Sequence, residues 1–188
     1  MKYIYPYASP LGGITLASDG EKLIGLWFDG QKYFADTLEP KAVAESTKSI
    51  KERLPIFEET IRWLDTYFRG AIPDFTPPLT IQSSPFREEV WKILLTIPYG
   101  QTMTYGQIAD ILAKRRGLPR MSAQAVGGAV GHNPISLIIP CHRVIGAKGN
   151  LTGYAGGIDK KIQLLTLEKI DTTKLFLPKK SAGPQKHI

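Results

Sequence analysis

Residues 104–129 read TYGQIADILAKRRGLPRMSAQAVGGA, and this stretch decides the fold of the C-terminal half. Thr104, with a glutamine three residues later, forms a capping box that predicts a helix over residues 105–113. A basic loop follows, and Ser122 is placed to cap a second helix over residues 123–129. Two short helices joined by such a loop are typical of a helix-turn-helix.

The sequence on either side of this helix pair predicts further helices and a wing. Ser84 followed by a proline is a helix start. After the pair come a buried apolar run at 135–139, a glycine-punctuated hairpin at 146–154 and a final helix at 159–169. These elements predict a mainly α, winged helix-turn-helix-like domain over residues 84–170.

The N-terminal part, residues 1–80, predicts a small antiparallel sheet and one helix. Strand-like runs rich in Ile, Tyr, Leu and Trp, separated by glycine-containing turns, lie at residues 2–7, 14–17 and 23–28. Apolar residues at helical spacing predict a helix over 55–69, with Gly70 as its C-terminal cap. Three prolines mark residues 71–83 as a linker. The fold class expected of the chain is therefore α/β, of the α+β type.

Positive charge is concentrated in the C-terminal half. Residues 1–83 carry 9 basic and 11 acidic side chains, a net charge of −2, whereas residues 84–170 carry 11 and 5, a net charge of +6. Residues 171–188 add a further +3 and are expected to form a loose basic tail. Such a distribution fits a polyanionic partner for the C-terminal domain, and it also fits an ordinary solvated surface.

Cysteine usage and hydropathy limit the class of protein. The chain has one cysteine, so an intrachain disulfide and a cysteine-based zinc site are both excluded. No apolar stretch reaches the roughly 18–20 residues of a membrane span, and the N-terminus lacks the apolar core of a signal peptide. A cytoplasmic, reducing location without membrane association is expected.

The single cysteine stands in the segment Pro140-Cys141-His142-Arg143-Val144. A thiolate is the nucleophilic form of cysteine, and neighbouring histidine or arginine side chains lower the pKa of a thiol. Neighbours in sequence need not be neighbours in space, however, and a lone cysteine is more often an inert buried residue. The segment by itself therefore leaves both readings open.

The context of this segment resembles the O6-alkylguanine-DNA alkyltransferase family, also called methylated-DNA–protein-cysteine methyltransferases. The resemblance covers the chain from Pro85 to about Lys169. Its motifs, in order, are Thr104-Tyr105, Ala125-Val126-Gly127-Gly128, Asn133-Pro134, the Pro-Cys-His-Arg-Val segment, Gly153-Tyr154-Ala155-Gly156-Gly157 and Glu168. The N-terminal half is similar to the family only in its general α/β pattern.

The resemblance implies a role for each of five residues. Cys141 is the acceptor of the alkyl group, and His142 is the base that takes the thiol proton through a water molecule. Glu168 orients and charge-compensates that histidine. Tyr105 protonates the departing guanine, and Asn133 holds together the segments around the active site. Glu168 also falls within the apolar arc of its predicted helix, where an unpaired acid would be costly to bury.

The resemblance also implies a DNA-binding surface and a flipped base. The implied contacts are Gln124, Ala125, Gly127, Gly128, Arg143, Tyr154 and Ala155. Small residues on the second helix suit close, sequence-independent approach to the minor groove, and they would equally suit tight packing against another helix. The family usually has an arginine where this chain has Gln124, which predicts weaker DNA binding or slower base flipping.

Three other functions compete with this interpretation. A Cys–His–Glu hydrolase would need no basic helix-turn-helix, and a transcriptional regulator would need base-reading side chains on its second helix. A non-catalytic sensor of alkyl damage would lack the cysteine. The favoured function is irreversible, single-turnover repair of O6-alkylguanine, and of O4-alkylthymine as a further possible substrate, in double-stranded DNA by a monomer. It requires no cofactor and no metal, because the alkyl group comes from the DNA.

Overall fold

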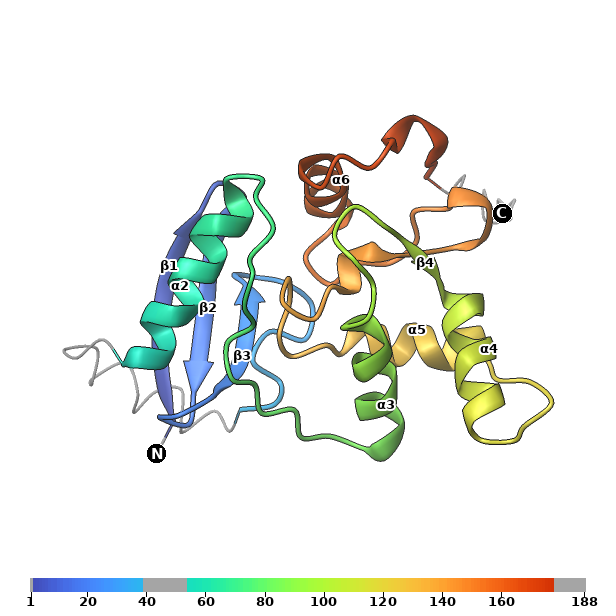
Figure 1. Ribbon diagram of the computed structural model, residues 1–188, viewed down its shortest axis with the longest axis horizontal. Helices are drawn as coiled ribbons and strands as arrows, with labels where there is room; N and C mark the ends of the chain where they lie inside the picture. Colours follow the sequence, from blue (N-terminus) through green and yellow to red (C-terminus); the bar gives the residue numbers. More distant parts are fainter. Residues whose placement is uncertain (1, 39–53, 178–188) are drawn as a thin grey trace, which may run out of the picture.

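The computed structural model describes residues 2–38 and 54–177 (Figure 1). At the N-terminal side, β1 (Tyr3–Ser9), β2 (Gly12–Ser18) and β3 (Leu23–Phe28) form an antiparallel sheet in the order β1-β2-β3. The helix α2 (Pro55–Phe68) packs on this sheet, and Gly70 follows it with a φ of 78°, a conformation that favours glycine. The predicted sheet, helix and glycine cap are thus confirmed.

The expected linker is attached to the sheet along part of its length. The Leu23 amide donates to the Pro78 carbonyl, and the Thr80 amide donates to the Leu23 carbonyl, both at 2.9 Å. Three residues further along β3, Leu26 makes the same kind of parallel bridge to Ile135, from the C-terminal half. The strand β3 therefore joins the two halves through backbone hydrogen bonds.

The C-terminal half is built mainly from helices, as expected (Figure 1). Its elements are α3 (Pro85–Leu94), β4 (Met103–Thr104), α4 (Tyr105–Arg115), α5 (Ala123–Gly131), the 3-10 turn η1 (Cys141–Arg143), β5 (Val144–Ile145) and α6 (Ile158–Leu167). The α+β fold class is confirmed.

The helix starts follow the predicted capping chemistry at two of three positions. Thr104 Oγ1 accepts from the Gln107 amide at 3.1 Å, and Gln107 Oε1 accepts from the Thr104 amide at 2.7 Å. Ser122 Oγ accepts from the Ala125 amide at 3.2 Å. Ser84 occupies the N-cap of α3, but its side chain makes no capping hydrogen bond, so the proline at the next position is what marks that start.

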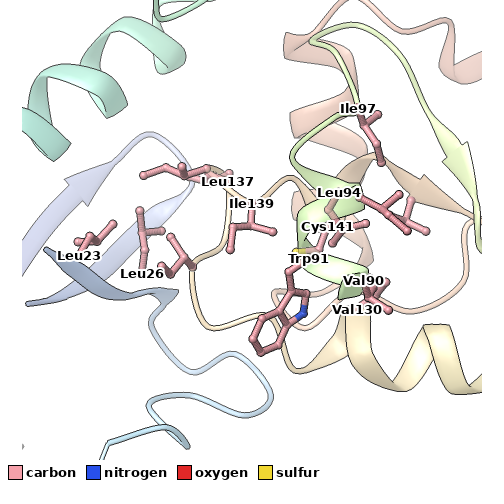
Figure 2. Packing of buried hydrophobic residues seen from close by; sticks show 14 of the residues in the cluster. Leu23, Leu26, Val90, Trp91, Leu94, Ile97, Val130, Leu137, Ile139 and Cys141 are labelled. Carbon is pink, nitrogen blue, oxygen red and sulfur yellow. The ribbon is translucent and has the colours of Figure 1, made fainter. Parts of the chain in front are cut away.

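One hydrophobic core extends across both halves of the chain. Figure 2 shows Leu23 and Leu26 of β3 on one side of Leu137 and Ile139, with Trp91 of α3 and Cys141 on the other. The run 135–139 is buried throughout, as its apolar sequence predicts. This run leads the chain from α5 through the core to Cys141.

Two expectations about the C-terminal segments are wrong. Residues 146–154 do not form a hairpin: they contain a 3-10 turn, η2 (Ala147–Gly149), and the preceding β5 pairs in parallel with the distant β4. Residues 171–177 are not loose, because the Leu151 amide donates to the Phe176 carbonyl at 2.8 Å. The partner of the glycine-rich segment is thus the stretch around Phe176. The rest of the expected tail, 178–188, lies outside the described residues.

Among residues 2–38 and 54–177, no helix combines the length and the apolar character needed to cross a membrane.

Candidate active site

Asn133 holds the segment that delivers Cys141 to its position. The Asn133 side chain donates to the Ile139 carbonyl at 2.7 Å and accepts from the Ile135 amide at 3.0 Å. Between these anchors, Leu137 has a φ of 70°, which is strained for a non-glycine residue. Because Asn133 is itself buried, the loop around it is tied down from inside, and Cys141 begins η1 directly after it.

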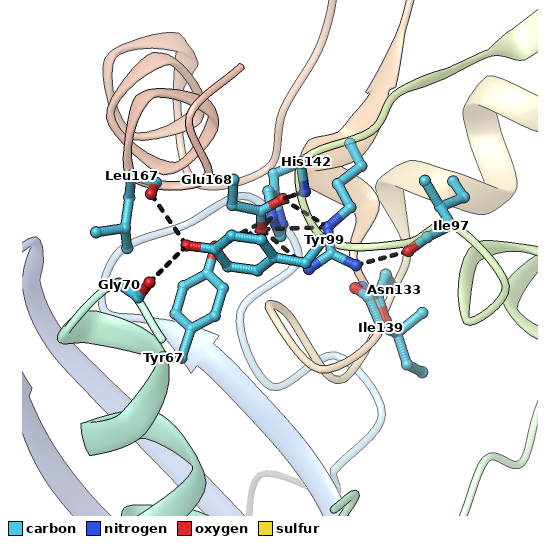
Figure 3. A network of polar contacts seen from close by, with 11 residues as sticks. Tyr67, Gly70, Ile97, Tyr99, Asn133, Ile139, His142, Leu167 and Glu168 are labelled. Atoms are coloured by element: carbon cyan, nitrogen blue, oxygen red, sulfur yellow. Dashed lines mark hydrogen bonds and ion pairs between the residues drawn. The ribbon is translucent and has the colours of Figure 1, made fainter. Parts of the chain in front are cut away.

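His142, the residue after the cysteine, forms a buried pair with Glu168 (Figure 3). His142 Nε2 lies 2.7 Å from Glu168 Oε1, and both side chains have 0% exposure. An ionised carboxylate can only accept hydrogen bonds, so Nε2 carries the proton that lies between them. His142 Nδ1 is buried and has no partner within the part of the chain that the structure describes. In the neutral ring, that second nitrogen is the basic one.

Arg143 lies inside the site and away from the expected DNA-binding role. Its guanidinium donates to both Glu168 oxygens at 2.9–3.1 Å, and its Nη1 donates to the Ile97 carbonyl at 2.7 Å. It is 9% exposed. The carboxylate of Glu168 attracts this cation more strongly than solvent does, because a bidentate pair with a buried acid is among the stronger hydrogen-bonded contacts. Arg143 was predicted to contact DNA, but in the structure its guanidinium binds Glu168 and the Ile97 carbonyl within the protein.

The titration behaviour of the site follows from burial and from these partners. Burial would raise the pKa of Glu168, but the hydrogen bonds and charges of His142 and Arg143 outweigh it and lower that pKa to about 2. Burial lowers the pKa of His142, which keeps the ring neutral at pH 7. Glu168 is therefore the permanent charge of the pair, and His142 is its neutral partner.

The thiol of Cys141 requires a nearby base to ionise at neutral pH. It is 4% exposed, and burial raises its pKa, while a hydrogen bond with Asn133 and the charge of Lys161 act in the opposite direction. A thiol with a raised pKa is mostly protonated at pH 7, so its reaction requires a base close by. The unpartnered Nδ1 of His142, on the next residue, is the base that the structure offers.

Lys161 is a fully buried cation whose contribution the sequence did not reveal. Its Nζ donates to the carbonyls of Val144, Thr152 and Gly153 at 2.5–3.4 Å, which ties the glycine-rich segment to β5. Burial lowers its pKa to about 8. Lys161 in α6 and Glu168, the residue that caps the end of α6, are thus both buried, each with internal partners.

A pocket of about 230 Å³ opens onto Cys141. Its walls come from four segments: Tyr105 of α4; Gly127, Gly128, Val130 and Gly131 of α5; Gly153, Tyr154 and Ala155; and Lys32 and Tyr33 from the loop after β3. Burial raises the pKa of Tyr105 to about 12, so its hydroxyl stays protonated at neutral pH. The N-terminal half therefore supplies one wall, which the sequence did not predict.

The loop that carries this wall is held in place by specific contacts. The Tyr33 ring stacks on His132, with ring centroids 3.8 Å apart, and the Lys32 amide donates to the Ala155 carbonyl at 3.0 Å. Tyr33 adopts a φ of 61°, which shows that the loop is bent sharply at this point.

The outer face of α5 is exposed, and its residues other than Gln124 are small. Gln124, Ala125 and Gly128 are exposed. A Cβ added at Gly128 would meet no atom within 4 Å, and one at Gly127 would only touch the Tyr105 ring at 3.8 Å. Packing within the chain therefore does not require these glycines. Their small size leaves the helix face open to an external partner.

These features define a class of protein: one in which a buried cysteine follows an Asn-anchored loop, lies next in sequence to a histidine of a buried His–Glu pair, and lines a pocket beside a helix with an open face. Comparison with known proteins specifies the class further. The model of the 6-O-methylguanine DNA methyltransferase DNA-binding domain matches residues 85–170, and that of the ribonuclease-like domain of the same family matches residues 1–81. The chain belongs to the 6-O-methylguanine DNA methyltransferase family.

Individual relatives agree with this assignment. The chain is 44% identical over 161 residues to a methylated-DNA–protein-cysteine methyltransferase of Mycobacterium bovis, covering 86% of this chain and 88% of that protein. A Methanosarcina acetivorans protein of the same name is 43% identical over 166 residues, with coverages of 88% and 97%.

Solved structures agree as well. The crystal structure of the Mycobacterium tuberculosis O6-methylguanine methyltransferase superposes with a TM-score of 0.71 at 43% identity, over 90% of this chain and 93% of the other. A structure of the M. tuberculosis protein OGT in complex with DNA has a TM-score of 0.70 at 38% identity, over 92% and 94% of the two chains.

Proposed function

We propose that this protein repairs DNA by direct reversal, transferring a methyl or larger alkyl group from O6 of guanine to Sγ of Cys141. One observation carries the proposal: Cys141 lines a pocket beside α5, and the next residue, His142, forms a buried pair with Glu168. The family relationship agrees with it.

The transfer begins with loss of the thiol proton. This proton passes to Nδ1 of His142 through a bridging water molecule, and the resulting imidazolium is stabilised by Glu168 across the 2.7 Å contact. Sγ then attacks the alkyl carbon, an S–C bond forms, and the bond from that carbon to O6 breaks. Guanine leaves with the electron pair of the broken bond.

Tyr105 is the group that stabilises the departing base. Its hydroxyl lines the pocket and donates to the Thr152 and Gly153 carbonyls at 3.2 and 3.4 Å, which are long bonds that a substrate can displace. Because the hydroxyl is protonated at neutral pH, it can donate a proton to the guanine anion. The thioether on Cys141 is stable to cellular reductants, so each molecule reacts once.

The pocket requires the damaged guanine to leave the duplex. O6 is paired and stacked inside DNA and cannot reach a sulfur at the base of a pocket. Docking of the small-residue face of α5 in the minor groove brings the pocket to the DNA without long side chains that read sequence. Gln124, Ala125, Gly127 and Gly128 lie on this helix, whereas Tyr154 and Ala155 line the pocket and contact the flipped base. The proposed unit of action is a monomer in the cytoplasm, where the thiol stays reduced.

Intact mass spectrometry tests this function. The protein is incubated with a duplex that contains one O6-methylguanine, and a matched duplex with guanine serves as the control. We expect a gain of about 14 Da, stoichiometric with the damaged duplex, and no gain in Cys141→Ser. Binding without a mass change would indicate a damage sensor. No binding and no mass change, with turnover of ester substrates, would indicate a hydrolase.

A further inference from the structure

Tyr67 brings the N-terminal half of the chain into contact with the reactive pair. It lies in the last turn of α2, is 0% exposed, and points to the His142–Glu168 pair in Figure 3. Its hydroxyl donates to Glu168 Oε1 at 2.8 Å and lies 3.2 Å from His142 Nε2. Resting on the proposed alkyl transfer, we propose that Tyr67 is a positioning residue that holds Glu168 and His142 in their reactive arrangement.

The direction of the hydrogen bonds limits what Tyr67 can do. A hydroxyl has one proton, and the carboxylate of Glu168 can only accept, so the Tyr67 proton points to Oε1. The hydroxyl oxygen then faces Nε2–H of His142, which already donates to the same Oε1. Arg143 also donates to Oε1, so the side chains of Tyr67, His142 and Arg143 all contact this one oxygen atom of Glu168. This arrangement restrains the proton to Nε2 and the imidazole plane to one orientation, which leaves Nδ1 directed away as the base.

A comparison with Tyr99 shows that this is more than the routine pairing of a buried hydroxyl. Tyr99 is another tyrosine of the same aromatic cluster, with its ring 6.1 Å from that of Tyr67. Its hydroxyl donates to the backbone carbonyls of Gly70 and Leu167, which is how buried tyrosines are commonly satisfied. Tyr67 instead contacts two side chains, and these are the two that the proposed chemistry depends on.

The ring of Tyr67 is held rigidly. Trp63 stacks on it with centroids 5.3 Å apart and planes 9° apart, and Phe68 packs edge-on at 5.5 Å. A side chain immobilised by its neighbours can fix the groups it contacts without a further loss of rotamer freedom during the reaction. The sheet and α2 therefore contribute to the reaction through Tyr67, in addition to supporting the fold.

Removing the hydroxyl also changes the charge that His142 experiences. The charged and titratable groups facing the pair are Arg143, Lys161, Cys141, Tyr67, Tyr99 and Tyr154. Of these, Tyr67 donates to the oxygen that binds His142 and so withdraws negative charge from it. Without this donor, Oε1 attracts protonated His142 more strongly, and the acidic limb of the rate–pH profile moves to higher pH.

The test compares Tyr67→Phe with Tyr99→Phe, each of which loses one hydrogen-bonded hydroxyl. For each variant we measure the single-turnover rate of methyl transfer at saturating protein across pH 5–9. We also measure the affinity for damaged duplex and the midpoint of thermal unfolding. For Tyr67→Phe we expect the transfer rate to fall on the order of tenfold, which is the effect of losing one hydrogen bond to a charged group. We also expect the acidic limb of the rate–pH profile to move to higher pH and the DNA affinity to stay unchanged. Tyr99→Phe should keep the wild-type rate and profile.

Three outcomes would overturn the inference: a wild-type rate and profile in Tyr67→Phe, an equal loss in both variants, or a loss explained by DNA affinity alone. If the wild-type protein itself gained no methyl group, the proposed function would fail instead, so the two failures are distinguishable.

Discussion

His142 Nε2 lies 2.7 Å from Glu168 Oε1, and neither side chain is exposed to solvent. Because Glu168 also accepts from Arg143 and from the Gly100 amide, its negative charge is balanced on several sides. The buried carboxylate of Glu168 is therefore compensated by its hydrogen-bond donors and by the charge of Arg143. The pKa of Glu168 and the stability of the folded protein are consequently coupled.

Glu168→Gln should slow the transfer and destabilise the fold. At pH 7 we expect a loss of about 3–5 kcal/mol in the free energy of unfolding, because the buried Arg143 loses its anionic partner. The transfer rate should fall by roughly 100-fold, since His142 loses the charge that stabilises its protonated form. Urea unfolding and single-turnover kinetics measure the two effects.

The same variant tests the pH dependence. Glu168 has a pKa of about 2 in the folded protein and about 4.3 in an unfolded chain. Its contribution to stability is therefore fully present above about pH 4.3 and is lost as the pH falls towards 2. Wild-type protein should lose stability over this window more steeply than Glu168→Gln. Glu89→Gln, which removes an exposed ion pair with Arg116, is the control and should change neither property much. Parallel acid profiles for all three proteins would contradict the assignment.

Gln124→Arg should tighten DNA binding. Gln124 is exposed at the start of α5, so an arginine there can reach a phosphate or the gap left by a flipped base. One added phosphate contact steepens the slope of log K against log salt by about 0.9. Equilibrium binding to an O6-methylguanine duplex at several salt concentrations measures this slope. Gln163→Arg makes the same charge change on α6 and should leave the salt dependence of binding unchanged. An equal effect in both variants would mean that the tighter binding comes from net charge alone.

Tyr33→Ala should widen the range of alkyl groups that react. Tyr33 lines the pocket from the loop after β3 and is stacked on His132, so its removal opens one wall. We expect the rate for O6-benzylguanine relative to O6-methylguanine to rise by roughly tenfold, a typical effect of pocket size. Competition between the two modified duplexes gives this ratio. Phe34→Ala removes the adjacent aromatic ring, which does not line the pocket, and should leave the ratio unchanged. A ratio unaffected by Tyr33→Ala would mean that other walls set the size limit.

Features encoded within a few residues were predicted from the sequence. The capping bonds of Thr104 and Ser122, the glycine cap at Gly70 and the buried run 135–139 depend on neighbours along the chain, and the structure confirms them. The Pro-Cys-His-Arg-Val segment with its flanking motifs likewise predicted the family, which the comparisons confirm.

Features that depend on distant partners were missed or misassigned. The family resemblance implied that Arg143 contacts DNA, yet the buried carboxylate of Glu168 binds it. The glycines of 146–154 suggested a hairpin, yet Asn150 in this segment pairs with Phe176 instead. In both cases the local sequence is compatible with either arrangement. The contact with a distant residue, Glu168 or Phe176, selects the arrangement that is observed.

The sequence by itself determined two helix starts and the mixed α+β architecture, because these rest on capping bonds and apolar periodicities among residues close along the chain. The tertiary structure alone decided that Tyr67, 101 residues from Glu168, reaches its carboxylate, and that Tyr33 closes the pocket. The physical reason is packing: both contacts depend on how the N-terminal sheet unit docks against the helical half through a shared core, and no local pattern records that docking.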